Sequence, residues 1–298
     1  MDKQTENSIV ELVLEQLREQ GAATGVSNGK PGEVSLSGLG DASNASDPVV
    51  LEPQDFIGIE NPKNIEALKV MRKSSPARIL MGRSGARQRT PSLLNFMADH
   101  AAAIDAVLTD VSDDFLEKNG LFKVATVVKD KDEYLMRPDL GKKLSDTAKE
   151  DILQNCDKGK QVQIIVVDGL SSTAIEANVS DVMPALIQGL ESQGLSVGRP
   201  FFIQYGRVGV MDDVGPLLEC DVIVEFVGER PGLITAESMS AYMAYRPDHS
   251  TIEAGRTVVS NIHRNGTPPA EAGAHLATIV KKMVDNKASG MKLSSLLN

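Results

Sequence analysis

The chain has 298 residues, of which 41% are hydrophobic and 24% charged, enough apolar material for one large domain or two ordinary ones. With 41 acidic against 31 basic residues, its formal net charge of -10 argues against a nucleic-acid partner, because phosphate binding needs a basic surface. The absence of Trp and an aromatic content of 4% argue against a stacking platform for single-stranded nucleic acid.

Cysteine spacing and hydropathy argue against disulfide-rich, zinc-binding, secreted and membrane-spanning proteins. Cys156 and Cys220 show neither CxxC spacing nor a Cys/His pattern, so no disulfide framework or zinc site is indicated. The sequence has no secretory apolar region and no uninterrupted apolar stretch of about twenty residues. We therefore expect a cytoplasmic protein that does not span a membrane.

The N-terminal segment, residues 1–19, predicts an amphipathic helix. One side of this helix carries Ile9, Val10, Val13, Leu14 and Leu17. Residues 20–52 are rich in Gly, Ser, Ala and Asn without an apolar period, which is typical of a flexible linker. The tethered helix could dock on its own domain or recognise another protein, and the pattern leaves both open.

Residues 53–160 contain three helical patterns, NIEALKVMRK, TPSLLNFMADHAAAIDAVL and LSDTAKEDILQN, and we predict a helical domain here. Thr90 and Pro91 predict a helix start, with Thr90 as the N-cap and Pro91 at the first helical position.

The connection between the first two helical patterns is strongly basic. No acidic residue occurs between Glu66 and Asp99. The basic residues in this interval include Arg72, Lys73, Arg78, Arg83, Arg87 and Arg89. In an acidic chain this local excess suggests an acidic partner surface or an anionic ligand, and a solvated surface loop is an equally good interpretation.

Residues 161–298 change to short Val- and Ile-rich runs, VQIIVVDG, PFFIQYGRV, CDVIVEFVG and GRTVVSNI, which predict strands. MPALIQGLESQ, DDVGPLLE and EAGAHLATIVKKMVDNK predict helices between and after them. Alternating strands and helices indicate right-handed crossovers. The fold class is therefore α/β, a Rossmann-like, mostly parallel sheet preceded by a helical N-terminal region.

Ligands of such sheets bind outside the carboxyl ends of the strands. The residues that follow the first three runs are 168–172, 206–208 and 228–232, and glycines among them would let a ligand approach the backbone. In the third run, Glu225 lies on one face with Ile223 and Val227, which suggests that this face is partly wet.

Common catalytic signatures are missing. No strand is followed by G-x-G-x-x-G, and neither a P-loop nor a G-x-S-x-G motif occurs, so a nucleotide enzyme is disfavoured. The four histidines, His100, His249, His263 and His275, have no metal-binding spacing. His263 is the best functional candidate among them because it lies in a loop. No pair of carboxylates stands out as an acid/base couple.

Several motifs occur together in one order over residues 54–292: GRSGARQRTPSLLNFMADH, YLMRPDLGKKL, VVDGLSSTAI, PFFIQYGRV, VGERPGL, SNIHRNGTPPAEA and KASG. In this combination the chain resembles the small subunit, or light chain, of ethanolamine ammonia-lyase. The resemblance implies an ammonia-lyase that converts ethanolamine to acetaldehyde and ammonia by adenosylcobalamin-dependent radical chemistry. It also implies that the substrate lies in the TIM barrel of a separate large subunit.

On this resemblance the small subunit helps to bind the cofactor, and both subunits assemble as a heteromultimer with six of each. The family's cofactor contacts carry over to Val208, Glu229 and Val258. Other members have Cys at the position of Val258, so only a backbone or van der Waals contact could persist there. The D-x-H-x-x-G motif is absent, which fits a cofactor that keeps its own axial base. We expect no catalytic residue and no metal ligand in this chain, which should be inactive alone.

An amphipathic helix followed by a linker resembles the encapsulation peptides that bring enzymes into bacterial microcompartments, so shell proteins are expected partners of residues 1–19. The alternative is a non-catalytic adaptor of a metabolic microcompartment without cofactor contact. A cofactor subunit needs close-approach glycines and a polar acceptor at its strand ends, as at Gly206 and Gly228-Glu229, whereas an adaptor has no such need.

Overall fold

The computed structural model describes residues 56–297. The predicted N-terminal helix (1–19) and linker (20–52) lie outside the described residues. All residues that are described belong to one compact unit.

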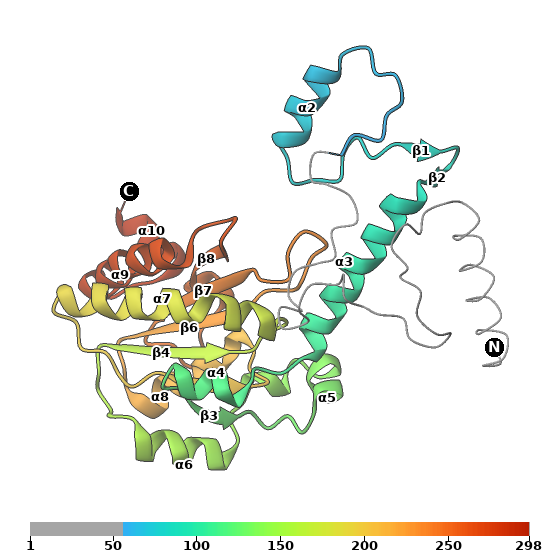
Figure 1. The fold of residues 1–298 in the computed structure, drawn as a ribbon. Coiled ribbons are helices and arrows are strands. Elements are labelled where there is room, and N and C mark those ends of the chain that lie inside the picture. The colour runs from blue at the N-terminus through green and yellow to red at the C-terminus, as the bar shows by residue number, and fades with distance from the viewer. Residues whose placement is uncertain (1–55, 298) are drawn as a thin grey trace, which may run out of the picture. The chain divides into compact units, whose positions relative to one another are not determined.

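The described chain is built on a six-stranded mixed sheet in the order β3-β5-β4-β6-β7-β8 (Figure 1). Its strands are β3 (Phe122–Ala125), β4 (Val162–Val167), β5 (Phe201–Gln204), β6 (Val222–Gly228), β7 (Met239–Tyr245) and β8 (Thr257–Ile262). The four strands from β3 to β6 are parallel, whereas β7 and β8 are added antiparallel. The α/β prediction is confirmed, and the sheet is mixed, with four parallel strands and two antiparallel ones.

Two strands of the six-stranded sheet, β3 and β7, were not predicted from the sequence. β7 reads MSAYMAY and contains no Val or Ile, and β3 is only four residues long, so neither gives the apolar β-branched signal of a core strand. β3 lies within residues 53–160, where only helices were expected, and pairs with β5. The division of the chain into domains at residue 160 stays a prediction.

Helices cover both faces of the sheet (Figure 1). The helices of the described residues are α2 (Ile65–Lys73), α3 (Thr90–Leu108), α4 (Asp113–Lys118), α5 (Lys131–Met136), α6 (Asp146–Asn155), α7 (Ser172–Ser192), α8 (Met211–Leu218), α9 (Pro269–Asn286) and α10 (Gly290–Leu297), and α2 lies away from the sheet. Short 3-10 helices, η1 (Leu140–Lys142), η2 (Val208–Val210) and η3 (Glu253–Gly255), and a hairpin of β1 (Arg83–Ser84) and β2 (Arg87–Gln88) complete the chain. Helix α3 begins at Thr90 with Arg89 in the cap position, one residue before the predicted cap.

The strand β4 shows how the two layers form. All six of its side chains are buried, and the five apolar ones are divided between two hydrophobic clusters. Ile164 and Val166 pack in the cluster with α7 and α9, whereas Ile165 and Val167 pack in the cluster with α6 and α8. Burial of each such side chain contributes about 1.5–3 kcal/mol, which explains why a continuous apolar run occupies the centre of the sheet.

The interpretation of Glu225 as a sign of a partly wet face is wrong. Its side chain is 0% exposed, because α8 and the segment before β8 cover this part of β6. Burial raises the pKa of Glu225 well above its usual range, although the nearby Arg256 opposes that rise. Arg256 itself pairs with Asp212 of α8 at 2.6 Å. Burial in the second cluster therefore favours the neutral form of the Glu225 carboxyl group.

Glycines at the carboxyl ends of the strands allow close packing of the protein's own loops, and their role in the approach of a ligand stays a prediction. A Cβ atom at Gly228 would lie 2.1 Å from the carbonyl oxygen of Ser171, and one at Gly206 would lie 2.7 Å from the Val167 side chain. Gly232, by contrast, has no atom nearer than 4.0 Å to the position of a Cβ.

We predict that Gly228→Ala lowers the free energy of unfolding by about 2 kcal/mol, because the added methyl group must displace the backbone of the neighbouring loop. Gly232→Ala, in the same connection, is the matched control and should change stability by less than about 0.5 kcal/mol. Urea denaturation of both variants measures the difference. Equal stability of the two variants would rule out this tight packing.

Candidate functional site

Three polar loops meet at the carboxyl edge of the parallel strands (Figure 1). They follow β4, β5 and β6 and correspond to the motifs at residues 168–172, 205–208 and 228–232. The amide N–H of Leu170 donates to the carbonyl oxygen of Gly228 at 2.9 Å, which joins the first loop to the third. The segments that follow the first three predicted strands therefore lie together at one edge of the sheet.

Asp168 joins the first loop to the second. Its two carboxylate oxygens accept the backbone N–H groups of Tyr205 at 2.9 Å and Gly206 at 3.0 Å. These bonds hold Tyr205 in the left-handed region, with φ of 57°. Burial raises the pKa of Asp168 to about 7, although the two N–H donors and the charge of Lys131 oppose that rise.

Tyr134 of α5 braces the same two loops from the other side. Its hydroxyl lies 2.5 Å from the carbonyl oxygen of Gly169 and 2.9 Å from that of Gly206, so its one proton can serve either. The Arg207 guanidinium lies 4.1 Å from the centre of the Tyr134 ring and donates to its carbonyl oxygen. Burial raises the pKa of Tyr134, which keeps the phenol protonated. Sequence reasoning missed this residue because it lies outside every predicted strand end.

Val208 is the first of the predicted cofactor contacts. It begins η2 directly after the braced loop, is half-buried and packs against the cluster that contains α6 and α8. The backbone position of Val208 therefore depends on Asp168 and Tyr134.

Glu229, the second predicted contact, follows β6 at the same edge and is half-buried. Its carboxylate accepts the hydroxyl groups of Ser238 at 2.8 Å and Ser240 at 2.6 Å and the backbone N–H of Asn261 at 3.0 Å. Burial alone would raise the pKa of Glu229, but these three donors and the nearby His263 outweigh it and lower the pKa. Glu229 is therefore an ionised acceptor at neutral pH.

His263, the histidine favoured from the sequence, is buried beside this carboxylate. Its Nε2 lies 2.9 Å from Oδ1 of Asn261, and its Nδ1 accepts the backbone N–H of Asn265. His263 thus supports the turn that supplies the Asn261 N–H to Glu229.

Val258, the third predicted contact, lies away from the edge. It sits within β8, opposite Tyr242 of β7, which in turn pairs with Glu225. The Val258 side chain is 42% exposed, and Ser260, two residues on, is also exposed. Alternate residues of a strand share one face. The outer part of the sheet therefore has an open face made of Tyr242, Val258 and Ser260.

Tyr242 connects the three predicted contacts. It packs, like Val208, against the cluster with α6 and α8, it is paired with Val258, and burial together with the charge of Glu229 raises its pKa. Val208 and Glu229 thus share the carboxyl edge, whereas Val258 lies on the adjoining sheet face. Sequence reasoning missed Tyr242 because it missed β7.

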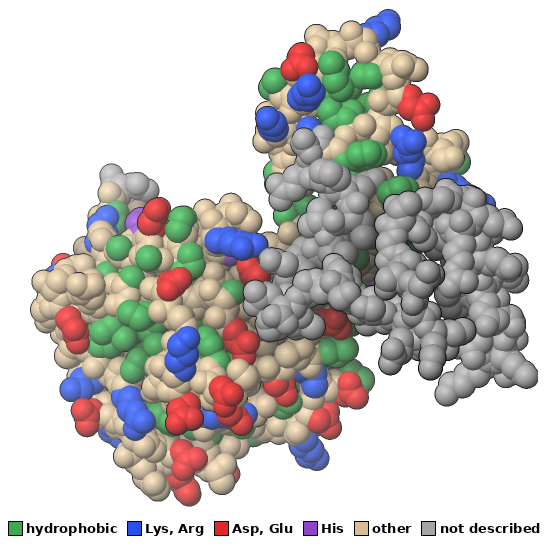
Figure 2. Space-filling model, viewed as in Figure 1, with side chains coloured by type: hydrophobic (Ala, Val, Ile, Leu, Met, Phe, Trp, Pro, Cys, Tyr) green, Lys and Arg blue, Asp and Glu red, His purple; other side chains and the backbone are tan. Residues whose placement is uncertain are grey.

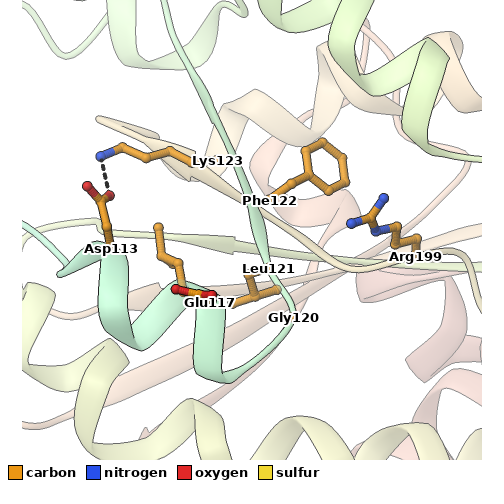
Figure 3. Close-up of a pocket in the computed structure, with 8 residues that line it drawn as sticks. Asp113, Glu117, Gly120, Leu121, Phe122, Lys123 and Arg199 are labelled. Carbon is orange, nitrogen blue, oxygen red and sulfur yellow. Dashed lines mark hydrogen bonds and ion pairs between the residues drawn. The ribbon is translucent and has the colours of Figure 1, made fainter.

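A pocket of ≈ 450 Å³ lies at the opposite edge of the sheet, where β3 begins (Figure 3). Its lining is Asp113, Leu116, Glu117, Gly120, Leu121, Phe122, Lys123 and Arg199. Lys123 pairs with Asp113 at 3.1 Å, and the Arg199 guanidinium lies 4.9 Å from the centre of the Phe122 ring. Both cations already have partners, so this pocket is not part of the candidate site.

Residues 56–297 contain no cluster of three or more His, Cys, Asp or Glu side chains arranged to hold a metal ion. Within the same residues, no helix combines the length and apolar character needed to cross a membrane.

The buried Asp168 carboxyl group predicts that the free energy of unfolding decreases as the pH rises toward 7. The folded pKa of about 7 lies above the ordinary value of about 4, so folding takes up a proton in this interval. The unfolding free energy of the natural chain, relative to Asp168→Asn, should fall on the order of 1 kcal/mol per pH unit from pH 4 to pH 7 and stay level above. Denaturant titrations at several pH values measure this difference, and a constant difference would refute a buried Asp168 that titrates.

Comparison with known proteins agrees with the motif order. The family model described as ethanolamine ammonia-lyase light chain (EutC) matches residues 65–294. The ethanolamine ammonia-lyase small subunit of Lachnoclostridium phytofermentans is 47% identical over 298 residues, covering 98% of this chain and 99% of the relative. That of Clostridium perfringens is 53% identical over 235 residues, covering 79% and 80%.

The matched region contains every strand of the sheet and all three loops of the carboxyl edge. Asp168, Val208 and Glu229 therefore lie within the part of the chain that the family model describes. The chain belongs to the ethanolamine ammonia-lyase light-chain family.

Proposed function

We propose that this chain is the small subunit of an adenosylcobalamin-dependent ethanolamine ammonia-lyase and contacts the cofactor at its interface with the large catalytic subunit. The observation that carries the proposal is the ionised Glu229 carboxylate, held at the carboxyl edge beside the open face of Tyr242, Val258 and Ser260. Membership of the light-chain family supports it.

The residues at this edge fit the chemistry of a corrin, a broad apolar ring whose rim carries neutral amides. Two of the three donors to Glu229 reach Oε1, and only Ser238 reaches Oε2, so Oε2 retains the capacity to accept an amide N–H. The exposed Val258 side chain offers apolar contact. Val208 would supply a second apolar contact from the β5 end.

When bound, adenosylcobalamin supplies the radical chemistry that converts ethanolamine to acetaldehyde and ammonia. The part of this chain is to position and to shield. Asp168 and Tyr134 fix the loop of Val208, the two serines and Asn261 orient Glu229, and the apolar face excludes water. Substrate binding and catalysis belong to the large subunit, so this chain alone should be inactive. We propose a cytoplasmic assembly with six copies of each subunit.

The cofactor contact is tested with Glu229→Ala in the complex with the large subunit. Loss of one charge-assisted hydrogen bond should weaken adenosylcobalamin affinity about tenfold or more, while the two subunits still co-purify. Titration followed by absorbance measures the affinity. Glu191→Ala, at the carboxyl end of α7, is the matched control because it removes an exposed Glu without any partner at this edge.

The natural complex provides the reference for this test, since turnover should need both chains and added cofactor. Unchanged cofactor affinity in Glu229→Ala would remove the assigned contact and favour the adaptor alternative. Turnover by this chain alone would overturn the division of labour between the subunits.

We also propose that residues 1–19 act as an encapsulation peptide that brings the complex into a bacterial microcompartment. The proposal rests on the amphipathic pattern of this segment and on the linker composition that follows it. Deletion of residues 1–19 should leave turnover unchanged and abolish co-purification with shell proteins. A control that replaces Glu11 and Glu15 by Gln keeps the apolar side and should retain co-purification. Shell proteins that still co-purify with the shortened chain would exclude this role.

A further inference from the structure

Helix α3 exposes an apolar stripe along its whole length. The stripe consists of Leu93, Leu94, Met97, Ala101, Ile104 and Leu108, all of them exposed. The exposed fractions of Leu93, Met97, Ile104 and Leu108 are 43%, 57%, 45% and 53%. Their spacing of three or four residues puts them on one side of the helix.

This stripe is unusual for a helix of a soluble protein, which normally turns its apolar side inward. The buried residues of α3 are Ser92, Asn95 and Ala106, so the larger apolar side chains Leu93, Leu94, Met97, Ile104 and Leu108 are on the exposed side. The carboxylates on α3 are Asp99, which pairs with Arg78, and Asp105. A continuous apolar surface of this kind marks a site of protein association more often than a chance exposure.

The stripe ends at the same edge of the sheet as the candidate site. At the end of α3, the carbonyl oxygen of Thr109 accepts the hydroxyl of Ser172 at 2.7 Å, directly after the Asp168 loop. Near its start, Arg78 donates to the carbonyl oxygen of Leu233 at 3.1 Å, in the connection that begins with Glu229. A protein that covered the stripe would therefore also face the carboxyl edge.

Basic residues border the stripe at its N-terminal end. The β1–β2 hairpin directly precedes α3 and carries Arg83 and Arg87, both exposed. Figure 2 shows Lys and Arg side chains on the part of the molecule that contains α2 and this hairpin in Figure 1. An apolar stripe next to exposed guanidinium groups fits a partner surface with apolar side chains at its centre and carboxylates at its rim.

We propose that the α3 stripe is the docking surface for the large subunit, whose carboxylates lie opposite Arg83 and Arg87. This inference rests on the proposed function, because a catalytic subunit has to face Glu229 to share a cofactor with it. A second copy of this chain on the stripe would occupy the space in front of the same edge and is disfavoured for that reason. The basic segment between Glu66 and Asp99 then acts at the subunit interface.

The test replaces Met97 at the centre of the stripe. Met97→Asp places a charge among desolvated apolar groups and should weaken binding of the full-length chain to the large subunit by about tenfold or more. Met291→Asp is the matched control, since Met291 is also an exposed methionine, on α10, with an exposed fraction of 70% against 57% for Met97. Surface plasmon resonance on the purified subunits gives the dissociation constants, and circular dichroism confirms that both variants fold.

A second variant, Arg83→Gln with Arg87→Gln, probes the rim. Its affinity for the large subunit should depend less on salt concentration than that of the natural chain, because two charge pairs are lost.

The proposal would be overturned if Met97→Asp bound the large subunit as tightly as the natural chain does. It would also be overturned if Met97→Asp and Met291→Asp lost affinity equally. A self-association of the natural chain that Met97→Asp abolishes would assign the stripe to a second copy instead. Failure of the natural chain to bind the large subunit at all would count against the proposed function itself.

Discussion

The carboxyl edge of this protein depends on one buried carboxylate. Asp168 receives two backbone N–H groups from the loop after β5, and the loop that contains it is also bonded to the end of β6. A buried acceptor with two donors is favourable only while both donors are present. Three strand ends therefore hold one another in place, and the positions of Val208 and Glu229 both follow from that arrangement.

The pKa values of the two carboxyl groups at this edge, Asp168 and Glu229, are shifted in opposite directions. Asp168 is enclosed, and its pKa rises because burial outweighs its hydrogen bonds. Glu229 is only half-buried, and its pKa falls because donors from β7 and β8 outweigh burial. The enclosed carboxylate thus serves the internal structure, whereas the accessible one keeps a negative charge and spare acceptor capacity for a ligand.

The sequence predicted the parallel centre of the sheet well, since β4 and β6 are Val- and Ile-rich runs and need no tertiary information. It did not predict β7, whose Ala and Met residues are buried only because β6 and β8 flank it. Tyr242 was not identified from the sequence because it lies in that strand. Glu225 was misread because a single strand pattern cannot show that α8 and Arg256 cover its face. Tyr134 was missed because its role arises from contacts more than thirty residues away.

The backbone conformation of Tyr205 has an entropic consequence for the binding of a ligand at this edge. A residue with a side chain at φ of 57° is less stable by about 1 kcal/mol than in an ordinary conformation, so the turn keeps this shape only because its neighbours hold it. The turn is consequently preorganised: its entropy is lost when the chain folds and not when a ligand arrives. A molecule that contacts Val208 would therefore meet a turn whose conformation is already fixed, which lowers the entropic cost of association.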